Sequence, residues 1–255
     1  SSDVLPVFRE YERSMATIMN AMVQPLVGKY IRQLEDGLAE KRIKAPLFIM
    51  KSNGGVFPPQ EAARSGAHMA LSGPAAGTNG AANLGNLCKI DDIITIDIGG
   101  TSADISLIKG GKAEIANGTK INDLPLSLAV TDIHTIGAGG GSLARISDNG
   151  AIMVGPKSAG SDPGPVCYGL GNNQPTVTDA NLLLGRINPD RPIGGKLEKL
   201  DVDAAYHAVE KQIATPLKLT VYEAADAIVR VANAKMAGAI RLVSVERGHD
   251  PKQFA

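Results

Sequence analysis

The chain has 255 residues, enough for one large domain or for parts of two. Its 26 Lys plus Arg balance its 26 Asp plus Glu, so the formal net charge is zero. This balance argues against a nucleic-acid partner and against an acidic lipid surface. No apolar run is long enough to span a bilayer, no signal peptide opens the sequence, and only two cysteines occur, at Cys88 and Cys167. These features predict a soluble, cytoplasmic protein with no membrane contact.

The first ninety residues predict helices around one short strand. Apolar residues at helical spacing predict a helix over 14–40, with its apolar face at Ile18, Met22, Leu26, Tyr30, Ile31 and Leu34. The run 47–50 predicts a buried parallel strand. The small residues of 74–86 predict a helix that packs closely against a neighbouring backbone.

The remaining elements surround a long irregular stretch. Residues 93–117 predict a three-strand meander whose second turn, at 109–112, contains the Gly-Gly pair that favours a two-residue hairpin. Residues 137–185 lack regular periodicity and are rich in glycine, which predicts a long ordered loop with a function. Helical patterns follow at 201–214 and 221–247, and Thr220 with Glu223 predicts a capping box.

The turn between the first two strands of this meander is the most informative feature of the sequence. Asp97 closes a strand, and Gly99 and Gly100 follow it. Glycines tolerate positive φ and let the backbone approach a ligand closely. Amides in such a turn can form an anion-binding nest, and Asp97 would hold a hydrated magnesium ion beside the bound phosphates.

The residues after these glycines extend the same hypothesis. Thr101 and Ser102 could donate hydroxyl hydrogen bonds to a phosphate, and Asp104 could orient a water or cap the turn. The layout is that of a phosphate-binding hairpin of the actin-like ATPase superfamily. The alternative is a tight structural turn beside a charged strand end.

A second glycine cluster follows at 137–142. The amides of Gly139, Gly140, Gly141 and Ser142 could bind a phosphate or a developing oxyanion. The alternative is a flexible loop or a close contact with a helix.

Two titratable residues precede that cluster. Asp132 and His134 lie two positions apart, so on a strand they would share one face. They could form an Asp–His pair for proton transfer or supply two metal ligands, although a lone histidine is more often structural.

The Pro/Gly-rich stretch 155–169 could line a substrate cleft through Lys157, Ser158 and Asp162. Cys167 has no basic neighbour in the sequence and is interpreted as a buried thiol rather than as a nucleophile. Thr178 or Asp179 is predicted to cap a helix, and a site role for Asp179 is the alternative.

Six ordered blocks of this sequence resemble the A subunit of the hydantoinase/oxoprolinase family: 50–55, 71–77, 96–104, 135–142, 155–169 and 175–186. The family includes N-methylhydantoinase, 5-oxoprolinase, caprolactamase and subunits of acetone- and acetophenone-type carboxylases. The resemblance implies an α/β, actin-like (ribonuclease H-like) ATPase fold with two lobes. We divide the chain accordingly into residues 1–88, the end of the first lobe with the connecting helix, and 89–255, the second lobe with the phosphate hairpin and a glycine-rich insertion.

The resemblance also implies a reaction. Family members use ATP and magnesium to phosphorylate the oxygen of a poorly reactive substrate, often together with a B-type partner subunit. We therefore expect ATP-dependent hydrolysis of a cyclic amide such as hydantoin or 5-oxoproline. Asp97 would hold the metal, and Asp132 and His134 would assist proton transfer. Residues 99–102 and 104 would contact phosphate, and residues 139–142 with Asp162 would serve the substrate or oxyanion.

Three alternatives stay open. A ketone carboxylase subunit of the same family would phosphorylate bicarbonate and an enolate, and no residue separates it from an amidohydrolase. A non-catalytic scaffold that binds a B-type subunit is the second. A sugar kinase fits less well, because the triple glycine and the block 162–165 do not belong to its pattern. The family's first phosphate hairpin and its adenosine-binding block do not occur in this sequence. We therefore expect an incomplete two-lobe fragment that is inactive by itself.

Overall fold

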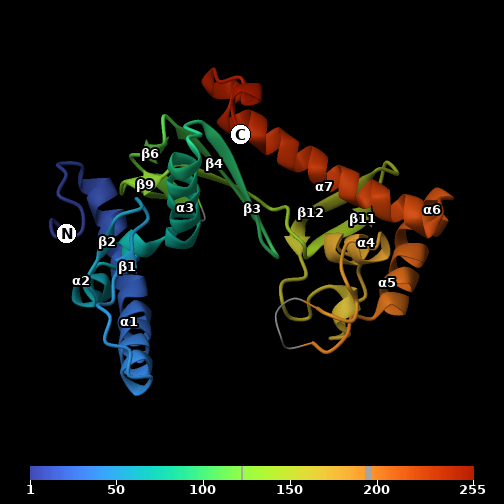
Figure 1. Cartoon of the computed structure of the whole chain (residues 1–255), viewed down its shortest axis with the longest axis horizontal. Coiled ribbons are helices and arrows are strands. Elements are labelled where there is room, and N and C mark those ends of the chain that lie inside the picture. The colour runs from blue at the N-terminus through green and yellow to red at the C-terminus, as the bar shows by residue number, and fades with distance from the viewer. Residues whose placement is uncertain (122, 193–196) are drawn as a thin grey trace. The chain divides into compact units, whose positions relative to one another are not determined.

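The computed structural model describes residues 1–121, 123–192 and 197–255, which form an α/β structure (Figure 1). The chain folds into two compact units. The first unit comprises Ser1–Thr95, Ser106–Ile133 and Gln253–Ala255, and the second comprises Ile96–Ile105 and His134–Lys252. The chain returns to the first unit at residues 106–133, so this partition differs from the division at residue 88. The assignment of ranges to lobes stays a prediction. Among the described residues, every helix is too short or too polar to cross a bilayer.

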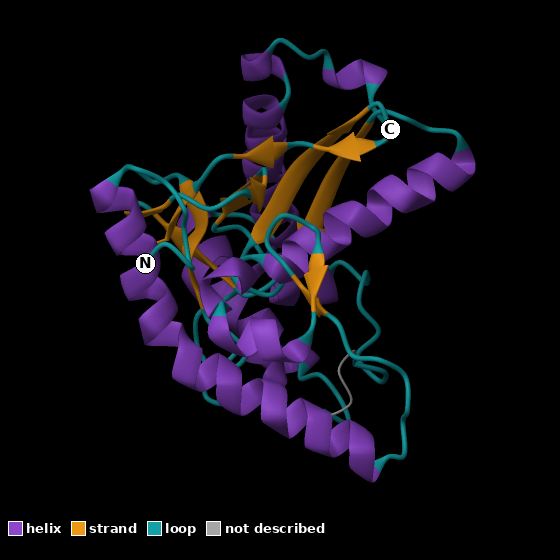
Figure 2. Cartoon of the chain, turned by 90° about the vertical axis from the view of Figure 1, so that its left-hand side faces the viewer, coloured by secondary structure: helices purple, strands orange, loops and turns teal. Residues whose placement is uncertain are grey.

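The first unit contains helices α1 (Glu10–Glu40), α2 (Pro59–Arg64), η1 (Gly66–Met69) and α3 (Ser72–Cys88). Figure 2 shows α1 as a long helix and the neighbouring strands in orange. Strands β1 (Ile49–Met50) and β2 (Val56–Phe57) pair antiparallel. The expected parallel strand at 47–50 is therefore wrong, because the turn at 51–55 reverses the chain at once. The predicted helix over 74–86 is confirmed by α3.

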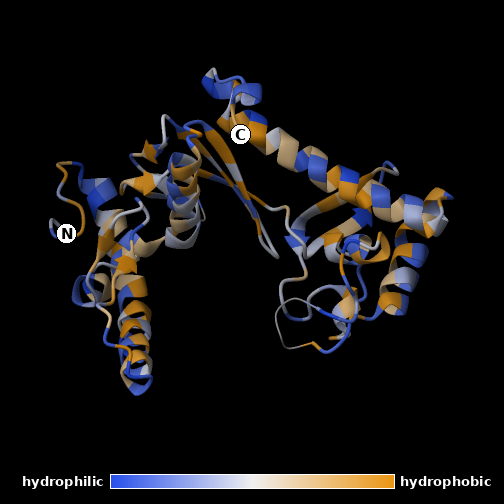
Figure 3. Cartoon of the chain, in the orientation of Figure 1, coloured by the Kyte–Doolittle hydropathy of each residue, from blue (hydrophilic) through white to orange (hydrophobic). Residues whose placement is uncertain are grey.

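Helix α1 has apolar residues on both its exposed and its buried sides, and Figure 3 shows apolar segments in orange along its length. The predicted apolar face is mostly exposed, at Ile18, Met22, Leu26 and Tyr30. The buried residues of α1 are Ala16, Asn20, Gly28 and Ile31, so of the predicted face Ile31 is confirmed as buried. Ala16 packs in one buried cluster with Leu5 and Ala67, and Ile31 packs in another with Ile49 and Phe57. The Asn20 amide group donates to the Arg64 carbonyl and its oxygen accepts from the Ala67 N–H, at 2.9 and 3.0 Å.

The central hairpin consists of β3 (Ile93–Ile98) and β4 (Ala103–Lys109), with β10 (Ile133–Ile136) on the other side of β4. Strand β5 (Lys112–Ala113) also pairs with β4, and the Gly110–Gly111 turn has φ values of +56° and +72°. That hairpin is confirmed. The predicted third strand is split, however, because β6 (Ile115–Ala116) pairs with β9 (Val130–Thr131). Strands β7 (Thr119–Ile121) and β8 (Leu124–Leu126) form a further antiparallel pair.

The second unit packs helices on the antiparallel pair β11 (Ser142–Ile146) and β12 (Ile152–Ser158). Sequence periodicity missed this pair because its register shifts between Ser142 and Ala144, which interrupts the alternation of apolar and polar residues. The helical elements are η2 (Val166–Tyr168), α4 (Val177–Leu183), α5 (Val202–Val209), η3 (Glu210–Ala214), α6 (Thr215–Leu217), α7 (Val221–Val243), η4 (Val245–Arg247) and η5 (Pro251–Gln253).

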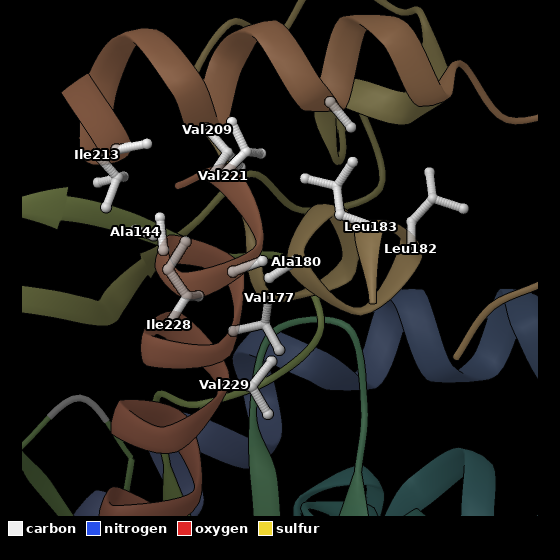
Figure 4. Packing of buried hydrophobic residues seen from close by; sticks show 14 of the residues in the cluster. Ala144, Val177, Ala180, Leu182, Leu183, Val209, Ile213, Val221, Ile228 and Val229 are labelled. Carbon is white, nitrogen blue, oxygen red and sulfur yellow. The ribbon is translucent and has the colours of Figure 1, made fainter. Parts of the chain in front are cut away.

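The core of the second unit lies between α4, α5, α7 and the β11–β12 pair (Figure 4). Val209, Ile213 and Ile228 are fully buried there. The Thr220–Glu223 capping box is confirmed at the start of α7. Helix α7 ends at Val243, four residues before the predicted end, and the chain continues as η4. The helix predicted over 201–214 is α5 followed by the π-helical turn η3.

Candidate functional site

The β3–β4 hairpin exposes to solvent the Asp97 carboxylate, near the end of β3, and the backbone of its turn at 99–102. Asp97 on β3 is exposed, as are Gly100 and Thr101 in the turn. The Gly99 N–H donates to the Ser102 carbonyl at 2.9 Å and closes the turn. Neither glycine has a left-handed φ, so the expectation that they supply positive φ is wrong. A Cβ at Gly100 would meet no atom within 4 Å, and one at Gly99 would lie 3.4 Å from the Ser102 oxygen.

The base of the hairpin is anchored to α3 by a chain of hydroxyl groups within the first unit. The buried Ser106 hydroxyl lies 2.9 Å from the Thr78 hydroxyl and 2.5 Å from the Thr95 hydroxyl. Thr78 in turn donates to the Pro74 carbonyl at 3.0 Å. Because buried hydroxyl groups without partners are costly, this chain holds both strands of the hairpin in register with the small-residue helix.

The glycine-rich loop 137–142 contacts the turn directly, backbone against backbone. The Gly140 N–H donates to the Gly99 carbonyl at 3.0 Å, and the Gly141 N–H donates to the Gly100 carbonyl at 2.6 Å. A Cβ at Gly139 would lie 2.7 Å from the Gly99 oxygen and 2.8 Å from the Thr101 nitrogen. Only a residue without a side chain fits there, which explains the run of glycines.

The amides of this loop are engaged inside the protein. The Gly139 N–H donates to the buried Ser142 hydroxyl at 2.8 Å, and the Ser142 N–H donates to the Gly139 carbonyl at 3.1 Å. The other two amides are those bound to the hairpin. The sequence suggested that these four groups face a phosphate or oxyanion, whereas in this arrangement all of them have protein acceptors. The loop acts here as a brace for the turn.

Helix α4 binds the brace through Thr178. Both the N–H and the hydroxyl of Thr178 donate to the Gly140 carbonyl, at 2.8 and 2.9 Å. Sequence reasoning placed the helix cap at Thr178 or Asp179, but the cap is Thr176, which forms a capping box with Asp179. The cap starts two residues earlier than expected, and Thr178 is thereby free to bind the loop. The pattern Thr-x-Thr-Asp could have indicated this choice, because Asp at the third helical position completes such a box.

The residues predicted for proton transfer are divided between the two units. Strand β9 ends before Asp132 and β10 begins after it, and these strands pair with different partners, β6 and β4. The expectation that one strand carries Asp132 and His134 on one face is therefore wrong. His134 is half-buried on β10. Asp104, on β4, accepts a 2.5 Å hydrogen bond from the Thr135 hydroxyl, which fixes its carboxylate. The roles of Asp132 and His134 stay predictions.

Cys167 and Asp179 form a structural pair. The Asp179 carboxylate is fully buried and accepts from the N–H groups of Val166, Cys167 and Thr176 and from the Thr176 hydroxyl, at 2.8–3.2 Å. Burial, and then the charge and hydrogen bond of Asp179, raise the pKa of the Cys167 thiol far above its ordinary value. The burial of Cys167 confirms the interpretation of a buried thiol, and a raised pKa disfavours the nucleophilic thiolate.

The available carboxylates suit a hydrated metal ion rather than an ion enclosed by several protein side chains. Among the described residues, no group of three or more His, Cys, Asp or Glu side chains could hold a metal ion. A single exposed carboxylate such as Asp97 fits Mg²⁺, which keeps several waters and shares its ligands with phosphates. Asp162 is exposed in the Pro/Gly loop. That loop is tied to the brace by the Ala159 N–H, which donates to the Gly141 carbonyl at 2.9 Å.

Comparison with known proteins finds relatives over nearly the whole chain. The sequence model of the hydantoinase/oxoprolinase family matches residues 13–255. The chain is 40% identical to the caprolactamase subunit alpha of Pseudomonas jessenii over 253 residues, which is 99% of this chain and 36% of that subunit. Among solved structures, a nucleotide-free acetone carboxylase matches with a TM-score of 0.86 at 32% identity, over 99% of this chain and 35% of that one. The crystal structure of ATP-dependent caprolactamase from Pseudomonas jessenii matches with a TM-score of 0.79 at 38% identity, over 99% and 36%. The chain thus spans roughly a third of the length of these relatives.

Proposed function

Because the chain belongs to the hydantoinase/oxoprolinase family, we propose that it is the nucleotide-binding part of an ATP-dependent enzyme that opens a cyclic amide. We further propose that its α/β structure is part of an actin-like ATPase fold. Two of its solved relatives are an acetone carboxylase, named for an ATP-dependent carboxylation, and an ATP-dependent caprolactamase. The name of the family, hydantoinase/oxoprolinase, favours a cyclic amide as the substrate of the enzyme that contains this chain.

One observation supports this proposal: the backbone hydrogen bonds from the brace, the glycine-rich loop 137–142, to the hairpin turn. They fix the Gly99 and Gly100 carbonyls from one side. Gly100 and Thr101 stay exposed beside the exposed carboxylate of Asp97. A turn intended only to reverse the chain needs no such brace. Fixing these carbonyls also fixes the peptide N–H groups of Gly100 and Thr101, and N–H donors in a fixed turn beside a carboxylate suit a magnesium–phosphate group.

The chemistry explains why ATP is needed. An unstrained amide is a poor electrophile, so its oxygen first attacks the γ-phosphorus and ADP leaves. Water then adds to the activated carbon and the ring nitrogen departs with a proton, which leaves an acyl phosphate. A second water releases phosphate. Asp97 would hold magnesium, which neutralises charge on the phosphates when bound. Thr101 and Ser102 would position the phosphate, and His134 and Asp132 would carry protons.

Relatives of this chain are named as subunits, among them the caprolactamase subunit alpha. We therefore propose that the chain works with a B-type partner that completes the reaction. A ketone carboxylase subunit is the second candidate, because the acetone carboxylase superposes with a TM-score of 0.86. The same hairpin would then deliver phosphate to bicarbonate and an enolate.

The test is turnover of the complete enzyme that contains this chain, measured as ADP release with hydantoin, with 5-oxoproline, and with acetone plus bicarbonate. Cyclic-amide substrates should stimulate ADP release, and Asp97→Ala should remove nearly all of it. Asp148→Ala, an exposed carboxylate in the β11–β12 turn, is the matched control and should stay active. Stimulation by acetone and bicarbonate alone would favour the carboxylase. Near-normal turnover of Asp97→Ala would refute the assigned role of Asp97.

A further inference from the structure

Thr178 on α4 directs two hydrogen bonds at a single backbone oxygen of the glycine-rich loop. Its N–H and its hydroxyl both donate to the Gly140 carbonyl, at 2.8 and 2.9 Å. A carbonyl oxygen has two lone pairs, so Thr178 uses both of them. A Cβ at Gly140 would lie 2.8 Å from the Thr178 hydroxyl oxygen, so the loop backbone lies directly against this side chain. These residues and the hairpin turn all belong to the second unit.

The peptide group between Gly140 and Gly141 carries this contact to the hairpin turn. Its C=O accepts from Thr178, and its N–H donates to the Gly100 carbonyl at 2.6 Å. Among the described residues, cis peptide bonds occur only before prolines, so this peptide is trans. A trans peptide is planar, and its C=O and N–H point in opposite directions. Fixing the carbonyl at one end therefore fixes the direction of the N–H at the other.

The next peptide group, between Gly100 and Thr101, repeats this geometry inside the turn. Its carbonyl accepts from Gly141, so its N–H, which is that of Thr101, points away from the glycine-rich loop. Thr101 is exposed beside the exposed Asp97. Hydrogen-bonded peptide groups in series polarise one another, which makes the last donor a stronger one. The Thr178 hydroxyl therefore acts on the Thr101 N–H through two peptide groups.

A second series of the same kind runs beside the first. The Ser142 N–H donates to the Gly139 carbonyl at 3.1 Å, and the N–H of that same peptide group, which belongs to Gly140, donates to the Gly99 carbonyl at 3.0 Å. The two series end at the successive N–H groups of residues 100 and 101, and successive N–H groups in a turn can form an anion-binding concavity. Because the second series begins at a backbone N–H, the Thr178 hydroxyl is the group that a substitution can remove without altering the loop.

We propose that Thr178 is a positioning residue of the phosphate site, which acts through the glycine-rich loop to aim the Thr101 N–H at a bound phosphate. Thr178 itself touches no phosphate. The inference rests on the proposed function, because it requires that a nucleotide phosphate binds at this turn. A purely structural Thr178 would behave differently. Its loss would lower the number of folded sites and leave the affinity of each folded site unchanged.

The test is a calorimetric titration of Mg-ATP into the complete enzyme that contains this chain, because affinity reports on the site and stoichiometry reports on the fraction of folded sites. Thr178→Val keeps the branched shape and the backbone N–H but removes the hydroxyl. We expect its affinity to fall about threefold to tenfold, the value of one hydrogen bond, at unchanged stoichiometry. Thr178→Ala should show the same loss. Thr178→Ser restores the donor and should recover the affinity of the wild type.

Thr17→Val is the matched control, because the Thr17 hydroxyl also donates to a backbone carbonyl, that of Arg13, at 2.7 Å. This variant should bind Mg-ATP like the wild type. Wild-type affinity in both Thr178→Val and Thr178→Ala, or a reduced stoichiometry with unchanged affinity, would overturn the inference. An equal loss of affinity in Thr178→Ser would also overturn it, because the hydroxyl is then not the cause.

Asp97→Ala in the same titration separates this inference from the proposed function. Lost affinity in Asp97→Ala together with wild-type affinity in Thr178→Val would refute the positioning role alone. Wild-type affinity in Asp97→Ala would instead refute the role assigned to Asp97.

Discussion

The backbone N–H of Gly140 donates a 3.0 Å hydrogen bond to the carbonyl oxygen of Gly99. This bond joins two glycines that are 41 residues apart in sequence. Side chains are excluded at the contact, since a Cβ at Gly139 would lie 2.7 Å from the same Gly99 oxygen. The direct contact between the two segments is therefore made by backbone atoms. A turn held in this way keeps its shape without placing a side chain where a ligand would lie.

Gly139→Ala should damage this contact. The added methyl group meets backbone that cannot move aside without shifting the turn, so we expect the free energy of unfolding to fall by about 1–3 kcal/mol. Chemical denaturation measures the change. Gly73→Ala in α3, where a Cβ meets nothing within 4 Å, is the matched control. Equal stability of the two variants would show that the brace is looser than its distances indicate.

Asp179 should be a principal stabilising residue of the second unit. Its fully buried carboxylate joins η2 to the start of α4 through four accepted hydrogen bonds. Asp179→Ala leaves those buried donors without partners, so we expect a loss of about 3–5 kcal/mol. Thermal and urea unfolding would measure it. Asp148→Ala, at an exposed turn, should change stability little, and a similarly small effect at Asp179 would contradict this role.

The two cysteines should differ sharply in reactivity. Cys88 is exposed and Cys167 is buried, and burial raises the pKa of the Cys167 thiol above its ordinary 9.0. The nucleophilic thiolate is therefore scarce at Cys167 from pH 7 to 9. Iodoacetamide followed by mass spectrometry should label Cys88 in the native chain and Cys167 only after unfolding. Rapid native labelling of Cys167 would contradict its burial.

The start of α7 should lose stability in acid. Hydrogen bonds from the Thr220 N–H and hydroxyl, both 2.8 Å, lower the pKa of Glu223 below its ordinary 4.5. A lowered folded-state pKa stabilises the fold fully above pH 4.5, and that stabilisation disappears as pH falls through the lowered value. Unfolding curves should therefore place Glu223→Gln below the wild type at pH 6–7. The two should converge as the pH falls below the lowered pKa of Glu223. A constant difference across this range would rule out the carboxylate as the cause.

The sequence correctly predicted those elements that a few neighbouring residues determine. The Thr220–Glu223 box, the Gly110–Gly111 turn and the small-residue helix α3 all appear as expected, because capping, turn geometry and propensity act over a few residues. The β11–β12 pair was missed because a register shift breaks its alternation. The buried side of α1 was only partly predicted: Ile31 is buried as expected, but Met22 and Leu26 are exposed, because helical periodicity does not show which apolar residues another element will cover.

Sequence reasoning selected residues of the candidate site but not the contacts that these residues make. Sequence reasoning selected the hairpin at Asp97 and the triple glycine, but it assigned the glycine amides to a ligand. Their acceptors are the Gly99 and Gly100 carbonyls, and no local pattern shows which distant backbone a glycine-rich loop will approach. The same limit explains Thr178, whose partner is 38 residues away. It also explains Asp132 and His134, which a break between two strands separates.

The most direct measurement is the affinity of the complete enzyme for Mg-ATP, determined by calorimetry for the wild type, Asp97→Ala, Gly100→Ala and Asp148→Ala. A Cβ at Gly100 meets no protein atom within 4 Å, so this variant should keep the fold but obstruct a phosphate at the turn. The account predicts saturable binding for the wild type and Asp148→Ala and a loss of at least about tenfold for the other two. Wild-type affinity in both Asp97→Ala and Gly100→Ala would contradict the claim that this hairpin binds the nucleotide.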